Sequence, residues 1–218
     1  HSVNELQGMG INPDVIVLRS DGEVGEDIRR KIALFCNVKP DCVISDITLD
    51  CLYETPIALH NAGLDKAVCK ALKLGGRLQL SDWKAFVKRA KNVKTEVKIA
   101  LVGKYVALHD AYLSVAEALR SGGYAVNVKV DIAWVDSETV TDNTAKKIFG
   151  DADGIIIPGG FGGRATEGMI ATCKYAREND VPCLGICLGM QMMVIEFARN
   201  VLGYADANSR EMDEKTPH

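Results

Sequence analysis

The sequence has no long apolar run and no block of basic residues. It offers no stretch of about 18 apolar residues for a membrane-spanning helix, and its first residues lack the basic and apolar regions of a signal peptide. The 26 lysines and arginines face 29 acidic residues, and the formal net charge of −3 gives little reason to expect a nucleic-acid partner. We therefore expect a soluble, cytoplasmic protein with no nucleic-acid and no membrane partner.

The cysteines lack the spacing of a disulfide framework or a zinc site. There are seven of them, an odd number, and none forms a Cys-x-x-Cys pair. Reduced thiols in a cytosol fit this pattern better than disulfides. With 218 residues, 47% of them hydrophobic, the chain can bury a sizeable core without such cross-links. Because it begins at His1 rather than at a methionine, we expect a fragment of a longer protein.

The first third of the chain has the pattern of a strand, a helix and a second strand. Residues 14–19 and 41–45 are short apolar runs after prolines and are predicted strands. Residues 26–35 lie between them, with apolar side chains at helical spacing and acidic residues in the first turn.

A polar, basic segment around Trp83 and Phe86 follows, and it is typical of an amphipathic helix in a connection between domains. We place the boundary near residue 95. The predicted domains are residues 1–75, a linker over 76–95, and residues 96–218.

Apolar strand patterns alternate with helical patterns in the second part. Strands are predicted at 97–102, 126–134, 154–157 and 182–186, and helices at 112–121, 166–178 and 189–201. This alternation predicts a parallel sheet covered on both faces. Because ligands bind such sheets at the carboxyl ends of the strands, the loops at 103–110 and 158–163 and the turn around Cys187 are the candidate sites.

The strongest local signal is the run LGICLGMQ, in which a strand enters Gly-x-Cys-x-Gly and then a helix. This is the pattern of a nucleophile elbow with Cys187 in place of serine. Glycines permit the sharp turn, the helix N-terminus stabilises a thiolate, and the backbone N–H of Leu188 becomes an oxyanion donor. The alternative is a buried core thiol beside glycines that only allow close packing, which the strand, elbow and helix context disfavours.

A second signal is a strand that ends in four glycines within five positions, in the run IIIPGGFGGR. Such a loop offers bare backbone N–H groups to an anion. By itself it could be a phosphate loop, a flexible turn or a lid hinge, and a turn is about as common for such a run as the other two together. It lacks the Gly-Lys-Ser/Thr ending of a Walker loop, so it gives weak support for nucleoside triphosphate binding.

Together, the PGGFG loop and the ICLGMQ elbow resemble class I glutamine amidotransferase domains. The runs HSVNELQGMGINPDVIVLRSD, KIALFCNV, VKIALVGKY, DAYLSVAEAL and DANSRE resemble the CTP synthase family, in that family's order. The resemblance covers nearly the whole chain. It implies an α/β fold: the end of a P-loop-type amidoligase (synthetase) domain, followed by a flavodoxin-like parallel-sheet class I glutaminase domain that is incomplete.

The resemblance implies a glutaminase centre. In this family a cysteine releases ammonia from glutamine, and the ammonia aminates ATP-activated UTP to CTP, a step of pyrimidine nucleotide biosynthesis. Cys187 matches the nucleophile. The residues that match the oxyanion and glutamine contacts are Gly160, Leu188, Gly189, Met190, Gln191 and Glu211.

The resemblance also implies nucleotide contacts. Lys31 matches a lysine that contacts UTP, or CTP as feedback inhibitor, although spacing alone favours a surface lysine. Arg19, Ile47, Thr48 and Leu49 fall where the family contacts ATP. Phe161 and Arg164 match, weakly, a lid where GTP acts as allosteric activator. ATP and magnesium are implied as well, with most of their binding residues outside this chain, and full-length members form homotetramers.

The resemblance places further catalytic groups outside the chain. The family's proton-transferring histidine and its carboxylate follow the nucleophile at a distance, whereas this sequence has no His-x-Glu motif. The P-loop and the magnesium-binding acids precede the matched runs. We therefore expect the fragment to be inactive alone. His109, in the loop at 103–110, is an alternative base, but a surface or capping role is the more common one for such a residue.

Two other interpretations stay open. The first is a non-catalytic nucleotide-binding or regulatory module derived from the same family. The second is a stand-alone cysteine hydrolase built on the same elbow, which the missing histidine and acid disfavour.

Overall fold

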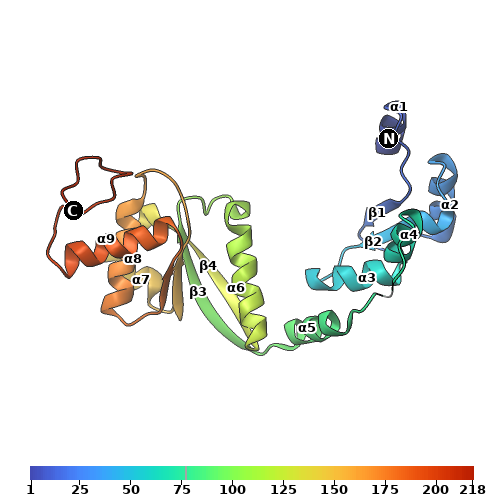
Figure 1. Ribbon diagram of the computed structural model, residues 1–218. Coiled ribbons are helices and arrows are strands. Elements are labelled where there is room, and N and C mark those ends of the chain that lie inside the picture. The colour runs from blue at the N-terminus through green and yellow to red at the C-terminus, as the bar shows by residue number, and fades with distance from the viewer. Residues whose placement is uncertain (77) are drawn as a thin grey trace. The chain divides into compact units, whose positions relative to one another are not determined.

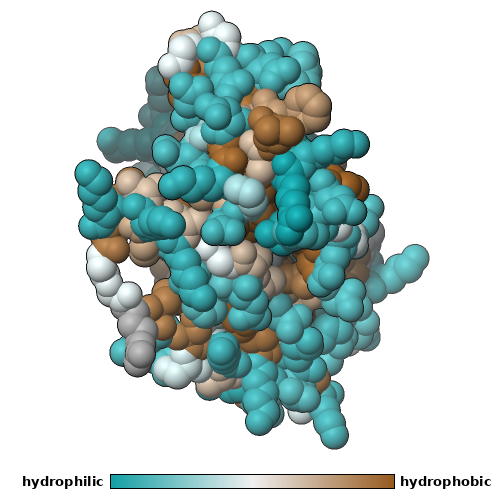
Figure 2. Space-filling model, turned by 90° about the vertical axis from the view of Figure 1, so that its right-hand side faces the viewer, coloured by the Kyte–Doolittle hydropathy of each residue, from teal (hydrophilic) through white to brown (hydrophobic). Residues whose placement is uncertain are grey.

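The computed structural model describes residues 1–76 and 78–218. Within them the chain forms two compact units, His1–Lys91 and Asn92–His218, each with its own parallel sheet (Figure 1). None of the helices in these described ranges combines the length and the apolar content that a bilayer span requires. On the surface drawn in Figure 2, hydrophilic side chains predominate and hydrophobic ones are scattered among them.

The first unit is built on two parallel strands joined by a helix. β1 (Ile16–Ser20) pairs with β2 (Val43–Ile47), and α2 (Glu26–Phe35) connects them, as the sequence predicts. β2 begins later than predicted because η1 (Pro40–Cys42) forms a 3-10 turn ahead of it. The other elements of this unit are α1 (Ser2–Gly8), η2 (Leu52–Glu54), α3 (Thr55–Asn61), α4 (Leu64–Ala71) and α5 (Ser81–Asn92).

Helix α5, which the sequence suggests as part of a connection, packs on the first unit. The indole Nε1 of Trp83 donates to the carbonyl oxygen of Tyr53 at 2.8 Å, and the rings of Tyr53 and Phe86 meet edge to face at 5.2 Å. Lys91 forms an ion pair with Glu54 at 2.9 Å. These contacts make most of the expected linker an ordered element of the first unit.

The second unit is a four-stranded, fully parallel sheet in the order β4-β3-β5-β6. Its strands are β3 (Thr95–Gly103), β4 (Val128–Asp136), β5 (Gly154–Ile157) and β6 (Cys183–Gly185). Its helices are η3 (His109–Tyr112), α6 (Leu113–Ala125), η4 (Ser137–Thr139), α7 (Asp142–Phe149), α8 (Thr166–Glu178) and α9 (Leu188–Asn200). The expected α/β fold with parallel sheets is confirmed.

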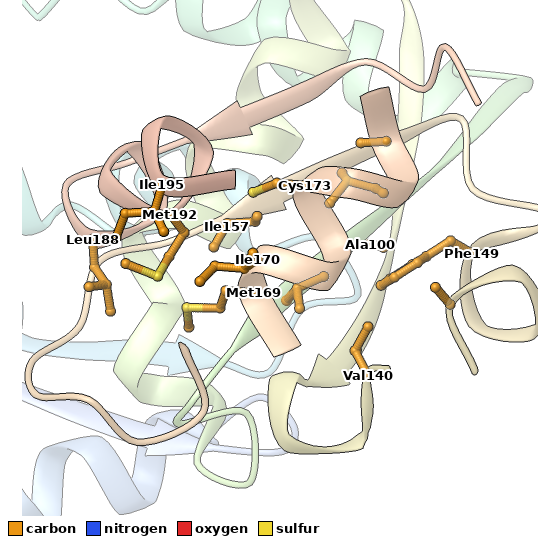
Figure 3. Close-up of a cluster of buried hydrophobic side chains, with 14 residues drawn as sticks. Ala100, Val140, Phe149, Ile157, Met169, Ile170, Cys173, Leu188, Met192 and Ile195 are labelled. Carbon is orange, nitrogen blue, oxygen red and sulfur yellow. The ribbon is translucent and has the colours of Figure 1, made fainter. Parts of the chain in front are cut away.

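Alternate residues of the strands bury two different cores. On one face, Ala100 and Ile157 pack against side chains of α7, α8 and α9, among them Phe149, Met169 and Met192 (Figure 3). On the other face, Leu101 and Ile156 pack with Tyr112 and partly buried residues of α6. The sheet is therefore covered on both faces, as the alternating pattern predicts.

The order of the strands reverses beside β3. The chain passes from β3 to β4 on one side of β3, and it then returns to add β5 and β6 on the other side. The carboxyl ends of β3 and β5 therefore form the switch point at which parallel α/β sheets bind ligands. Lys104 follows β3 there, and the glycine-rich loop follows β5.

Candidate active site

The turn between β6 and α9 holds Cys187 in a strained backbone conformation. Its φ of 52° and ψ of −106° lie outside the regions that side-chain-bearing residues prefer, and it is the N-cap residue of α9. Such strain is typical of a nucleophile elbow, where a sharp turn raises the reactive side chain above the sheet. Cys187 is exposed, whereas a core thiol would be buried.

Both glycines of the Gly-x-Cys-x-Gly motif are required by packing. A Cβ on Gly185 would lie 2.5 Å from the backbone of Gly189, and a Cβ on Gly189 would lie 2.1 Å from the carbonyl oxygen of Ile157. Both distances are far below ordinary van der Waals contact, so any larger residue would push the strand and the helix apart. The elbow can form because the backbones of β6, α9 and β5 pack directly against one another at these two glycines.

The glycine-rich loop after β5 borders this elbow. A Cβ on Gly159 would lie 3.6 Å from the Cβ of Cys187, and one on Gly160 would lie 3.2 Å from Cδ2 of Leu188. In the described part of the chain, the backbone N–H groups of Gly160 and Leu188 donate no hydrogen bond. The two expected oxyanion donors therefore belong to segments that meet at the nucleophile, and both are available to a ligand.

Hydrogen bonds of Arg164 hold the C-terminal end of the glycine-rich loop. The guanidinium of Arg164 donates to Oε1 of Glu138 at 2.6 Å and to the carbonyl oxygen of Lys104 at 3.2 Å. The side chain of Phe161 is 82% exposed. Of the two weakly matched lid residues, Arg164 is therefore held by protein contacts, and Phe161 is free to meet a ligand.

Lys104 is a site residue that the sequence reasoning missed. Its side chain is buried, and its ammonium donates to the carbonyl oxygens of Phe161 and Gly162. Burial, together with the nearby positive charge of Arg164, lowers the pKa of Lys104, and the carboxylate of Glu211 opposes this shift. The one available signal was its position at the start of the loop at 103–110, which the strand pattern marks as a ligand-facing loop.

The residues expected to bind glutamine are arranged around the elbow. Leu188 and Gly189 are buried at the start of α9, and Met190 is 52% exposed. Among the described residues, the Oε1 atom of Gln191 is buried and finds no hydrogen-bond partner, which is uncommon for a buried polar atom. Glu211 is exposed, and it lies in the segment that follows α9.

His109 has a structural contact of its own. Its ring stacks on Trp134, with the ring centroids 4.1 Å apart and the planes 10° from parallel. Trp134 packs with the core on the α6 face of the sheet, whereas Leu188 beside Cys187 belongs to the core on the opposite face. This stacking agrees with the surface role that the sequence favours for His109.

The residues expected to contact ATP lie at the carboxyl ends of β1 and β2. Arg19 donates to the carbonyl oxygen of Asp46 at 3.3 Å, and the hydroxyl of Thr48 donates to Asp21 at 3.0 Å. Ile47 ends β2, and Leu49 follows shortly after it. Arg19 and Ile47–Leu49 are therefore neighbours across one strand pair.

Lys31 is an exposed residue of α2, and no contact among the described residues joins it to Arg19 or Thr48. Among the described residues there is also no group of three or more histidine, cysteine or acidic side chains that would hold a metal ion.

Two protein families match this chain in consecutive segments. The family described as CTP synthase N-terminus matches residues 1–74, and the family described as glutamine amidotransferase class-I matches residues 107–218. The second match covers the described elbow and the glycine-rich loop.

Curated relatives match the chain from end to end. The CTP synthase of Clostridium beijerinckii is 53% identical over 217 residues, which are 99% of this chain and 40% of that protein. The CTP synthase of Clostridium acetobutylicum is 52% identical over 219 residues, which are 100% of this chain and 41% of that protein. The chain thus spans about two fifths of the length of these relatives.

A solved structure resembles part of this fold. The glutaminase domain of Trypanosoma brucei CTPS, determined with bound acivicin, is 43% identical and aligns with a TM-score of 0.53. The alignment covers 56% of this chain and 48% of that one. The flavodoxin-like glutaminase fold expected from the sequence is confirmed by this likeness, and the chain belongs to the CTP synthase family, with a class I glutamine amidotransferase domain over residues 107–218.

Proposed function

We propose that this chain supplies the glutamine-hydrolysing centre of a CTP synthase, in which ammonia released from glutamine aminates ATP-activated UTP to CTP. The observation that carries the proposal is the elbow itself: an exposed cysteine at the start of a helix, in a strained turn, beside two backbone N–H groups that donate to none of the described residues. This arrangement is that of an acyl-transfer centre with a thiol nucleophile.

The residues suit the chemistry of glutamine hydrolysis. The thiolate of Cys187 attacks the carboxamide carbon, and the N–H groups of Gly160 and Leu188 stabilise the oxyanion that forms. The C–N bond of the tetrahedral intermediate then breaks, and the nitrogen takes up a proton and leaves as ammonia. Water hydrolyses the resulting glutamyl thioester to glutamate and restores the thiolate of Cys187. The Oε1 of Gln191, which has no partner among the described residues, suits an N–H group of the substrate. The carboxylate of Glu211 suits the substrate's α-ammonium.

The proton transfers require a base, and no described contact joins a histidine to Cys187. We propose that a histidine serves as this base and that a carboxylate orients it. Both come from polypeptide outside residues 1–218, as the resemblance to the CTP synthase family implies. Residues 1–218 alone are then expected to hydrolyse glutamine slowly or not at all.

The nucleotide contacts are proposals of the same kind. A fixed ammonium at Lys31 suits the phosphate oxygens of UTP or CTP, and the strand ends at Arg19 and residues 47–49 suit ATP. GTP as activator at Phe161 and Arg164, magnesium bound mostly by residues outside this chain, and a homotetramer are proposed from the family.

The test is Cys187→Ala in a full-length CTP synthase polypeptide that carries this chain. Glutamine-dependent CTP formation should fall by at least about 10³-fold, because the nucleophile is lost, while synthesis from free ammonia should continue at the unaltered rate. Cys69→Ala, on a helix of the other unit, is the matched control and should change neither rate. Loss of both activities in Cys187→Ala would contradict the proposed division of labour.

A regulatory module is the second candidate, and the exposed hydrogen bonds of Arg19 and Thr48 are compatible with nucleotide binding without turnover. It predicts equal glutamine-dependent rates with and without Cys187. The same measurement therefore separates the two functions.

A further inference from the structure

Lys104 is a buried lysine at the switch point, and the expected glutamine and nucleotide contacts leave it without a role. Its residue surface is 5% exposed, and no carboxylate in the described part of the chain lies within ion-pair distance of its ammonium. Burying an ammonium without a counter-ion is costly unless hydrogen bonds compensate. The acceptors are two carbonyl oxygens of the glycine-rich loop, those of Phe161 and Gly162.

The backbone of Lys104 is fixed independently of this loop. The hydroxyl oxygen of Tyr112 accepts hydrogen bonds from the N–H groups of Lys104, at 3.1 Å, and of Tyr105, at 3.3 Å. The ring of Tyr112 also fills the space beside Gly103, where a Cβ would lie 2.6 Å from the ring. The end of β3 is therefore rigid, and the lysine stem starts from a fixed point.

The side chain crosses to the loop next to the nucleophile. A Cβ on Gly160 would lie 3.5 Å from Cδ of Lys104 on one side and 3.2 Å from Leu188 on the other. In return, Arg164 donates to the carbonyl oxygen of Lys104 at 3.2 Å. Two hydrogen-bonded connections in opposite directions thus join the end of β3 to the loop that carries Gly160.

Glycine-rich backbone needs such a restraint if its N–H groups are to act on a transition state. Glycine has the greatest backbone freedom of any residue, so a loop with four glycines in five positions loses the most entropy when ordered. An oxyanion donor is effective only when it is already oriented before the charge develops. The carbonyl oxygens of Phe161 and Gly162 belong to the peptide groups two and three positions after the one that carries the N–H of Gly160, so holding them restricts the backbone that orients this N–H.

We propose that Lys104 is a positioning residue for glutamine hydrolysis, whose ammonium holds the loop at Phe161 and Gly162 so that the N–H of Gly160 stays directed to the oxyanion. The inference rests on the proposed function, since it assigns Lys104 a part in the same reaction. It acts through the loop, without contact to the substrate.

The test compares Lys104→Met, which keeps the stem and removes the donors, with Lys104→Arg, which keeps a charged donor, in a full-length CTP synthase polypeptide carrying this chain. Lys104→Met should lower the glutaminase kcat by about 10²-fold with KM changed by less than about twofold, the size of effect seen when an oxyanion donor is lost. Lys104→Arg should recover about tenfold. Lys129→Met, at the opposite end of the sheet, is the matched control and should leave both constants unaltered.

A second readout does not depend on activity. Cleavage by chymotrypsin after Phe161, which is 82% exposed, should become at least tenfold faster in Lys104→Met, while cleavage elsewhere in the second unit keeps its rate. Faster cleavage throughout the second unit would show that Lys104 only stabilises the fold, and it would overturn the proposal. Unchanged cleavage after Phe161, or an unchanged kcat, would overturn it as well.

Failure of this inference can be told from failure of the proposed function. If Cys187→Ala abolishes glutamine-dependent synthesis while Lys104→Met retains kcat, the positioning role alone is wrong. If Cys187→Ala retains glutamine-dependent synthesis, the proposed function itself is wrong.

Discussion

The elbow in the second unit and the candidate nucleotide residues in the first differ in what fixes them. Around Cys187 the backbone of β5, β6 and α9 is in such close contact that Gly185 and Gly189 have no space for a side chain. In the first unit, the contacts that hold Arg19 and Thr48 are hydrogen bonds exposed to solvent. The conformation of the elbow is set by backbone packing, so a short run of residues is enough to specify it. The positions of exposed side chains such as Arg19 and Thr48 depend more on the ligand that binds them.

The largest expected effect is that of Gly189→Ala, because its Cβ would lie 2.1 Å from the carbonyl oxygen of Ile157. We expect the free energy of unfolding of the second unit to fall by about 3 kcal/mol and glutamine hydrolysis to be lost. Urea unfolding followed by circular dichroism measures the first, and glutamate release measures the second.

Gly122→Ala is the matched control. Gly122 lies in α6, a Cβ added there would meet nothing within 4 Å, and its φ is not positive, so the substitution should raise stability by up to about 1 kcal/mol. A Gly189→Ala protein as stable as the Gly122→Ala protein would mean that the elbow is not fixed by backbone contact.

The next effect concerns the helix that carries the elbow. Glu196 of α9 is 3% exposed and accepts hydrogen bonds from the guanidinium of Arg177 on α8 at 2.8 and 3.1 Å, which raises the pKa of Arg177. Glu196→Ala should lower the free energy of unfolding by about 1–2 kcal/mol, because it removes the hydrogen bonds of a buried carboxylate, while the partly exposed guanidinium of Arg177 stays solvated. Thermal unfolding of the two proteins checks this.

Glu178→Ala is its control, since Glu178 is an exposed partner of the same guanidinium at 3.4 Å. A loss below about 0.5 kcal/mol is expected there. Equal losses for the two variants would contradict the claim that burial makes the contact of Glu196 strong.

A smaller effect should appear in the pH dependence of stability. Burial and Arg164 lower the pKa of Lys104, so between this lowered value and the ordinary lysine value the unfolded chain binds more protons than the folded one. The free energy of unfolding contributed by this group therefore rises with pH across that window. Urea titrations at several pH values should show this rise in the unaltered protein and its loss in Lys104→Met; identical pH slopes would contradict the assignment.

The smallest effect is expected in the first unit. Thr48→Val removes the exposed hydrogen bond to Asp21 and should cost less than about 1 kcal/mol of unfolding free energy. Glutamine hydrolysis should not change, because Thr48 belongs to the first unit and the elbow to the second. A loss as large as that of Gly189→Ala would remove the distinction between the two kinds of site.

The sequence predicts the elements of the second unit well where apolar spacing is strong. The helix at 166–178 and the strand at 154–157 have the predicted bounds, and the elbow is present. Helix α7 is not predicted, because it is short and begins with a capping box of Thr141 and Thr144, in which threonine replaces the usual Glu or Gln.

The role of Lys104 is beyond sequence reasoning for a different reason. A lysine after a strand has the pattern of a surface residue, and its burial arises only when a loop 57 positions further along the chain closes over it. Contacts between distant segments of this kind are set by the packing of the whole sheet. The packing of α5 on Tyr53 escapes prediction for the same reason, since a polar helix around Trp83 gives no sign of its partner.

The most direct test of the central claim is to treat a full-length polypeptide carrying this chain with acivicin, the compound bound in the solved relative, and to map the modified cysteine by peptide mass spectrometry. Our account predicts modification at Cys187 and at none of the other six cysteines, with protection by glutamine. Modification spread over several cysteines without protection by glutamine, or an unmodified Cys187, would contradict the assignment of the elbow as a glutaminase nucleophile.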